Sequence, residues 1–137
     1  MKILLDTNII MDALQERQPF DTVAKEILSR SQSGDIKCSF TANAATDIFY
    51  IYSKARDISS ARNVLNYLLA NYEVITVTHG DCINAMSFPI EDFEDALVVI
   101  CGMKAGMDYI VTRDEKFLQV ESPIPLISPD KILEKFK

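Results

Sequence analysis

The chain has 137 residues, of which 48% are hydrophobic and 25% charged, values typical of an ordinary globular protein. We therefore expect one domain over residues 1–137, with a core that buries roughly two-thirds of the unfolded chain's surface. The net charge of −6 argues against a protein that binds nucleic acid through surplus Lys and Arg, because such proteins neutralise phosphates with positive charge.

The first apolar run is brief and an acid interrupts it, so we expect neither a signal peptide nor a membrane span, and we expect a cytoplasmic protein. The three cysteines, Cys38, Cys82 and Cys101, are odd in number, widely spaced and flanked by apolar residues. This pattern favours reduced thiols in the core over a disulfide framework or a zinc site.

The run Ile3–Leu5 predicts a central parallel strand that is covered on both faces, with Asp6 at its carboxyl end. Thr7 and Asn8 are predicted to cap the helix that follows. A second helix follows a Gln-Pro break and is predicted to end at Gly34, because glycine readily adopts the left-handed conformation that ends many helices.

Alternating apolar residues over 36–40 predict a second strand. The next helix is predicted from about residue 43 to 54, and Asp47 lies in its first turns. Ser59 or Ser60 is predicted to cap a further helix, which would form a helical hairpin with the one before it.

A β-branched run over 74–77 predicts the third strand, and a short helix is predicted over 81–87. A longer helix is predicted to open at residue 92 or 93 and to end at Gly106. Asp95 lies in its opening turn.

Residues 109–112 are predicted to form the fourth strand, directly before Asp114, and residues 125–127 the fifth. A final helix is predicted over 130–136. Strands that alternate with helices in this way predict an α/β fold, with a parallel sheet between helical layers. Ligands of such sheets bind beyond the carboxyl ends of the strands, which is where Asp6 and Asp114 fall.

Four aspartates, Asp6, Asp47, Asp95 and Asp114, each fall where a predicted strand or helix meets a loop. Carboxylates that are brought together raise one another's pKa, so they cannot all stay ionised unless a cation lies among them. If the fold gathers these four, the sequence predicts a Mg²⁺ or Mn²⁺ site. Asp6 alone has a second interpretation, as a helix cap.

Three segments in order resemble those of the PIN-domain ribonucleases: Asp6–Asn8, Phe93–Leu97 and Tyr109–Asp114. The resemblance spans almost the whole chain and is strongest to the toxin nucleases of bacterial toxin–antitoxin pairs. It implies a three-layer α/β/α fold whose parallel sheet has the strand order 3-2-1-4-5.

The resemblance also implies roles for individual residues. Three aspartates match the metal-binding positions of the family: Asp6, Asp95 and Asp114. Asp47 matches a helix-borne acidic position at which toxin-type members more often have Glu. Polar residues beside the site, which could orient the acids or a water molecule, are Thr7, Asn8 and Thr112.

The function that the resemblance implies is Mg²⁺- or Mn²⁺-dependent hydrolysis of RNA by a homodimeric toxin, which a cognate antitoxin protein holds inactive. Carboxylate oxygens suit Mg²⁺, and a bound metal can activate water and stabilise the leaving oxygen. No protein nucleophile is needed, so the single His79 is interpreted as a loop or surface residue rather than a general base.

Each functional interpretation has a competitor. Glu91, Asp92 and Glu94 are interpreted as a solvated acidic turn that complements a helix dipole. The basic residues Lys54, Arg56, Arg113 and Lys116 could steer RNA or could serve solubility alone. The alternative to the nuclease is an inactive PIN-like module that binds RNA or a partner protein.

Overall fold

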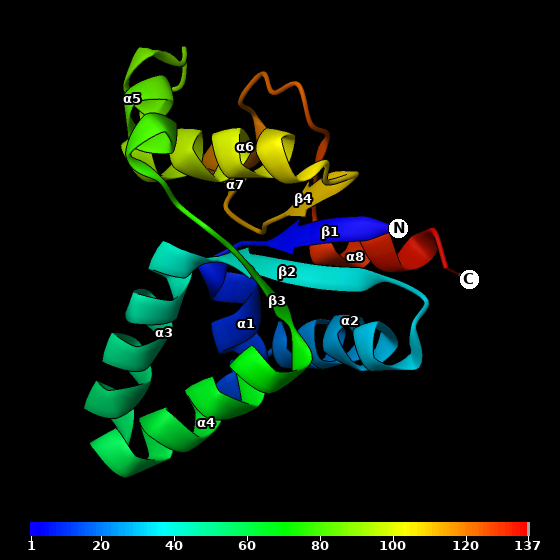
Figure 1. The fold of residues 1–137 in the computed structure, drawn as a ribbon. Coiled ribbons are helices and arrows are strands. Elements are labelled where there is room, and N and C mark those ends of the chain that lie inside the picture. The colour runs from blue at the N-terminus through cyan, green and yellow to red at the C-terminus, as the bar shows by residue number, and fades with distance from the viewer. Residues whose placement is uncertain (137) are drawn as a thin grey trace.

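The computed structural model describes residues 1–136, and within this range the chain forms five strands and eight helices (Figure 1). The strands are β1 (Lys2–Leu5), β2 (Lys37–Thr41), β3 (Glu73–Ile75), β4 (Tyr109–Val111) and β5 (Leu126–Ile127). The helices are α1 (Thr7–Leu14), α2 (Asp21–Ser33), α3 (Ala42–Ala55), α4 (Ile58–Asn71), α5 (His79–Ser87), α6 (Phe93–Ala105), α7 (Glu115–Leu118) and α8 (Pro129–Glu134).

The five strands form one parallel sheet in the order β3-β2-β1-β4-β5, which confirms the predicted fold class and strand order. Strand β1 lies at the centre, where Leu4 is in register with Ser39 on one side and Ile110 on the other. Ile3 and Leu4 are both 0% exposed, as a strand covered on both faces requires.

Two hydrophobic cores cover the two faces of the sheet. Successive side chains of a strand point to opposite faces, so Ile3 and Leu5 belong to one core and Leu4 to the other. The first core packs the sheet against α1, α2, α3, α4 and α8, and the second packs it against α5, α6 and α7. Figure 1 shows α3 and α4 as a hairpin that extends away from the sheet.

Two of the predicted helix caps are wrong. Helix α1 is capped by Asp6, which confirms the second interpretation of that residue: its Oδ1 accepts a hydrogen bond from the backbone N–H of Thr7 at 2.9 Å. Helix α4 is capped by Asp57, whose Oδ1 accepts from the N–H of Ser60 at 2.7 Å. In both cases an aspartate with extended backbone precedes the predicted serine, threonine or asparagine, which therefore lies inside the first turn.

Strand β3 ends at Ile75, two residues before the predicted end, and Thr76 lies outside the sheet with its carbonyl accepting from Lys104 Nζ at 2.7 Å. Helix α5 starts earlier than predicted, because Thr78 and Asp81 cap it reciprocally. His79 is therefore the first residue of a helix and is exposed, as a surface residue should be, although not in a loop.

The short helix α7, directly after Asp114, was not predicted. Helix α2 ends at Gly34 as predicted, with a left-handed φ of 93°. Cys38 and Cys101 are buried and Cys82 is half-buried, and all three are free thiols. Within residues 1–136, no helix has the length and apolar character that crossing a bilayer requires.

Candidate active site at the carboxyl edge of the sheet

Two of the predicted aspartates lie at the ends of neighbouring strands. Asp6 follows β1 and Asp114 follows β4, and these two strands are paired at the centre of the sheet. The backbone N–H of Asp6 donates to the carbonyl of Val111 at 3.0 Å, so the pairing of the strands continues to the edge. Each aspartate also caps the helix that follows it, so its side chain is fixed beyond the carboxyl end of its strand.

Thr112 links these two aspartates. Its side chain is 0% exposed, and its Oγ1 donates to Asp6 Oδ2 at 2.8 Å. The same Oγ1 accepts from the backbone N–H of Asp114 at 3.1 Å. Thr7 contacts Asp6 only through its backbone, Asn8 is exposed, and among the described residues neither side chain donates to an acid.

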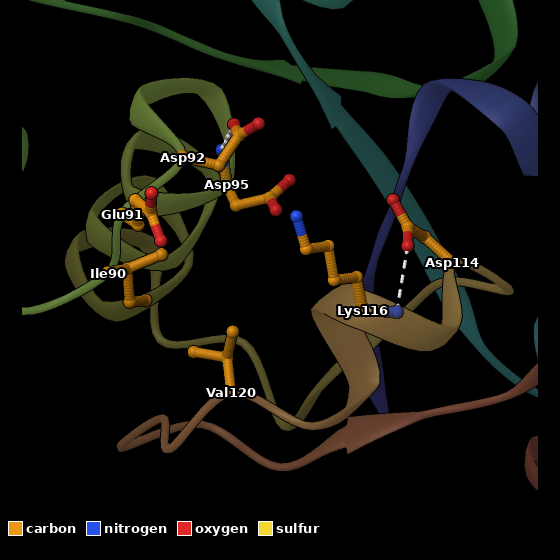
Figure 2. Close-up of a pocket in the computed structure, with 7 residues that line it drawn as sticks. All are labelled: Ile90, Glu91, Asp92, Asp95, Asp114, Lys116 and Val120. Atoms are coloured by element: carbon orange, nitrogen blue, oxygen red, sulfur yellow. Dashed lines mark hydrogen bonds between the residues drawn. The ribbon is translucent and has the colours of Figure 1, made fainter.

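Helix α6 brings a third aspartate to the same edge. Asp92 caps the helix, and its Oδ1 accepts from the backbone N–H of Asp95 at 3.0 Å. A cavity of about 390 Å³ lies between this first turn and α7, and residues 90–92 with Asp95, Asp114, Lys116 and Val120 line it. Figure 2 shows the Asp95 carboxylate pointing into the cavity, on the side that faces α7.

The carboxyl groups of this edge influence one another's ionisation. Burial, together with the charges of Asp92, Asp6 and Asp114, raises the pKa of Asp95 to about 7. Burial also raises the pKa of Asp6, against hydrogen bonds from Thr112 and Thr7, and the charge of Asp114 adds to the rise. Asp6, Asp95 and Asp114 therefore act as one electrostatic cluster, although they are far apart in the sequence.

Helix α3 carries the fourth predicted aspartate, Asp47, whose charge reaches Glu94 in the first turn of α6. Asp47 is half-buried. Burial, followed by the charges of Asp47 and Asp6, raises the pKa of Glu94. Glu94 is exposed, as the prediction of a solvated acidic turn requires, although the charges of Asp47 and Asp6 still reach it. Its position next to Asp95 in the predicted first turn was the only signal of this interaction in the sequence.

The basic residues do not share one role. Arg113 is held by the buried Asp12 and stacks on Phe20, with its guanidinium carbon 4.0 Å from the ring centroid. Figure 2 shows Lys116 extending from α7 into the cavity, toward the carboxylate of Asp95. Lys54 and Arg56 lie at the end of α3 that is far from Asp47, so they are not part of the acidic edge.

The donor set fits a divalent metal ion that keeps part of its water shell. Within residues 1–136, no three His, Cys, Asp or Glu side chains are already grouped so that they could hold a metal ion directly. Carboxylate oxygens are nevertheless the ligands that Mg²⁺ prefers, and Mg²⁺ usually retains several waters. Asn43, one turn before Asp47 on α3, adds a buried amide oxygen for which the described residues supply no hydrogen-bond partner.

The fold and the site define a class: a three-layer α/β protein with an acidic cluster at the carboxyl edge of a parallel sheet. A family model for the PIN domain matches residues 2–116 of the sequence. This match covers most of the chain, and the chain therefore belongs to the PIN domain family. A comparison with curated protein sequences gives no match.

Solved structures with a similar fold come from several bacteria. VapBC2 from Rickettsia felis, bound to a DNA fragment from its promoter, is 17% identical, with 93% of this chain and 98% of that chain covered and a TM-score of 0.68. DNA-bound VapBC from Salmonella typhimurium is 14% identical, with 94% and 98% covered and a TM-score of 0.69. The sarcin-ricin loop cleaving toxin VapC20 from Mycobacterium tuberculosis is 15% identical, with 84% and 92% covered and a TM-score of 0.67.

Proposed function

We propose that this protein is a metal-dependent endoribonuclease and the toxin of a toxin–antitoxin pair. The observation that carries the proposal is the cluster of Asp6, Asp95 and Asp114 at the carboxyl edge, together with membership of the PIN domain family. The similar fold of a toxin that cleaves the sarcin-ricin loop supports RNA as the substrate class.

In this proposal Asp6, Asp95 and Asp114 hold Mg²⁺ or Mn²⁺, and Asp47 takes part directly or through water. When bound, the metal ion supplies positive charge against the phosphate and makes the attacking water more acidic. Thr112 orients Asp6 by donating to Oδ2, and the N–H of Thr7 donates to Oδ1, which leaves a second lone pair free on each oxygen. Lys116 places a cation in the same cavity, where it can approach a phosphate oxygen of the substrate.

Protein partners are the second part of the proposal. Several structures of similar fold are toxin–antitoxin assemblies, among them a complex from Klebsiella pneumoniae. On this chain, large apolar side chains are exposed on the helical hairpin and on α5 and α6, including Tyr50, Ile58, Ile83 and Met86. Exposed apolar side chains of this size support contact with an antitoxin and with a second copy of the chain.

The experiment is a cleavage assay on defined RNAs with Mn²⁺, with EDTA, and with the variants Asp6→Asn, Asp95→Asn and Asp114→Asn. Each variant should lose cleavage and keep its fold, because it replaces a carboxylate at the edge with an amide of the same shape. Asp130→Asn is the matched control, since Asp130 is exposed in the first turn of α8, and this variant should cleave as the wild type does.

A thermal melt separates the nuclease from the alternative, an inactive module that binds RNA or protein. A ligand that binds only the folded state raises the melting temperature as its concentration rises. At a ligand concentration of one hundred times Kd, the free energy of unfolding increases by about 2.7 kcal/mol. Mn²⁺ should therefore stabilise the wild type and not Asp6→Asn. Mn²⁺-dependent cleavage that persists in purified Asp6→Asn contradicts the proposed site.

A further inference from the structure

A buried carboxylate that the proposed mechanism does not use lies next to the acidic edge. Asp12, in the last turn of α1, is 1% exposed. Its Oδ2 accepts from Nε of Arg113 at 2.6 Å, and its Oδ1 accepts from Nη2 of the same guanidinium at 3.0 Å. This is a two-point pairing between a planar guanidinium and a carboxylate, the ion-pair geometry that fixes orientation most strongly.

The partner of Asp12 lies between two residues of the site. Arg113 follows Thr112, which donates to Asp6, and precedes Asp114, whose N–H donates back to Thr112 Oγ1 at 3.1 Å. Phe20 covers the guanidinium from the other side, at 4.0 Å from its carbon to the ring centroid. The Arg113 side chain is therefore fixed at two points, and its backbone sits in the segment that joins β4 to α7.

We propose that Asp12 is a positioning residue that acts through Arg113 to hold Thr112 and Asp114 in place for the acidic site. The ion pair anchors the loop after β4 to the buried face of α1, and Asp6 caps the other end of that same helix. The two ends of α1 thus fix both strands that carry the site. We call the ion pair between Asp12 and Arg113 the clamp. Its effect on metal and RNA rests on the proposed function, whereas its effect on the loop after β4 does not.

A matched control is available in the opposite layer. Asp81 is also a buried carboxylate in an ion pair, with its side chain 8% exposed and its Oδ2 2.5 Å from Lys104 Nζ. It belongs to α5, and among the described residues its side chain has hydrogen bonds to Thr78 and Lys104 and none to Thr112 or Asp114. Asp81→Asn weakens the ion pair with Lys104 and leaves the ion pair between Asp12 and Arg113 intact. It therefore measures the effect of a general loss of stability alone.

The first measurement is amide hydrogen exchange at Thr112 and Asp114 in Asp12→Asn, Arg113→Gln, the double variant and Asp81→Asn. Protection should fall by about tenfold or more in the first three and stay near the wild-type value in Asp81→Asn, because only the clamp variants free this loop. Should Asp12→Asn fail to fold, Arg113→Gln, whose side chain is 30% exposed, supplies the same comparison.

The second measurement is function, with Mn²⁺ alone as the ligand in a melting experiment and RNA in a kinetic one. Asp12→Asn and Arg113→Gln should each lose about 10- to 100-fold in Mn²⁺ affinity and kcat, with KM for RNA changed by no more than about twofold. Asp12 also lies 3.8 Å from a guanidinium nitrogen of Arg17, a contact that Asp12→Asn weakens and Arg113→Gln leaves in place. The double variant should therefore be no worse than Asp12→Asn alone. Asp81→Asn should bind Mn²⁺ and cleave as the wild type does.

The outcomes separate the two proposals. Wild-type protection at Asp114 in Asp12→Asn, an equal loss in Asp81→Asn, or losses that multiply in the double variant each overturn the clamp. A wild-type protein that neither responds to Mn²⁺ nor cleaves RNA overturns the proposed function instead. In that case the exchange measurement alone decides whether Asp12 holds the loop.

Discussion

The raised pKa of Asp95 has a consequence for stability that can be measured without any substrate. The unfolded chain loses this proton near pH 3.8, whereas the folded protein keeps it until about pH 7. Between these two values the folded state binds more protons, so the contribution of Asp95 makes the protein less stable as the pH rises. Below pH 3.8 and above pH 7 the contribution of Asp95 is constant, because both states are then equally protonated.

The magnitude follows from the size of the change. A rise of the pKa from 3.8 to about 7 would correspond to about 4 kcal/mol of stability without screening, because each pKa unit corresponds to about 1.36 kcal/mol. Asp95 is only half-buried, so water and salt screen the charges around it and reduce the effect to roughly 1–2 kcal/mol. Replacing Asp95 by Asn would remove this unfavourable charge and so stabilise the folded state. The neutral amide also loses the favourable interaction of a carboxylate with the helix dipole, which subtracts about 0.5 kcal/mol from that stabilisation.

We therefore expect metal-free Asp95→Asn to be more stable than the wild type at pH 8 and to show a smaller fall in stability between pH 4 and 7. Urea unfolding across this pH range, in the presence of EDTA, measures both effects. Asp130→Asn, which neutralises an exposed aspartate in the first turn of α8, should keep the wild-type slope. A variant of Asp95 that is less stable at pH 8, or that keeps the full slope, refutes the electrostatic reasoning.

Two further predictions concern Thr112 and the cysteines. Thr112→Val keeps the shape of the side chain but removes the hydrogen-bond acceptor for the N–H of Asp114 and the donor to Asp6 Oδ2. We expect this variant to lose about 1–3 kcal/mol of stability, measured by urea unfolding. We also expect kcat to fall by about 10-fold or more. Burial raises the pKa of Cys38 and of Cys101 to about 11, so iodoacetamide at pH 8 should label half-buried Cys82 first, as mass spectrometry of the native protein can show. Labelling of Cys38 at the same rate contradicts the burial argument.

The strands could be predicted from local sequence patterns, whereas their order came from the resemblance to PIN-domain ribonucleases. Apolar runs such as Ile3–Leu5 and residues 109–112 are short, continuous and bounded by polar residues, which is typical of strands covered on both faces. Ends of elements were harder to predict. At Asp6 and Asp57 several capping residues stand in a row, and only the backbone conformation decides which of them precedes the helix.

The site was predicted only in part, for a physical reason. Asp6, Asp95 and Asp114 could be assigned because each adjoins a recognisable strand end or helix start, and the fold brings their charges together. Glu94 and Asp12 could not. The charge of Asp47 on α3 acts on Glu94 on α6, and Asp12 meets Arg113 from 101 residues away, so no spacing in the sequence reveals either interaction.

The separation of the acidic edge from the two cores explains how the fold tolerates its own repulsion. The side chains of Leu4, Val99 and Phe117 are 0% exposed and belong to one hydrophobic core, so they stabilise the fold whatever the ionisation of the edge. Neutralising an edge aspartate should then relieve repulsion without creating a cavity, whereas truncating a core residue would cost roughly 2–5 kcal/mol. Loss of activity in the edge variants can for this reason be attributed to chemistry rather than to unfolding.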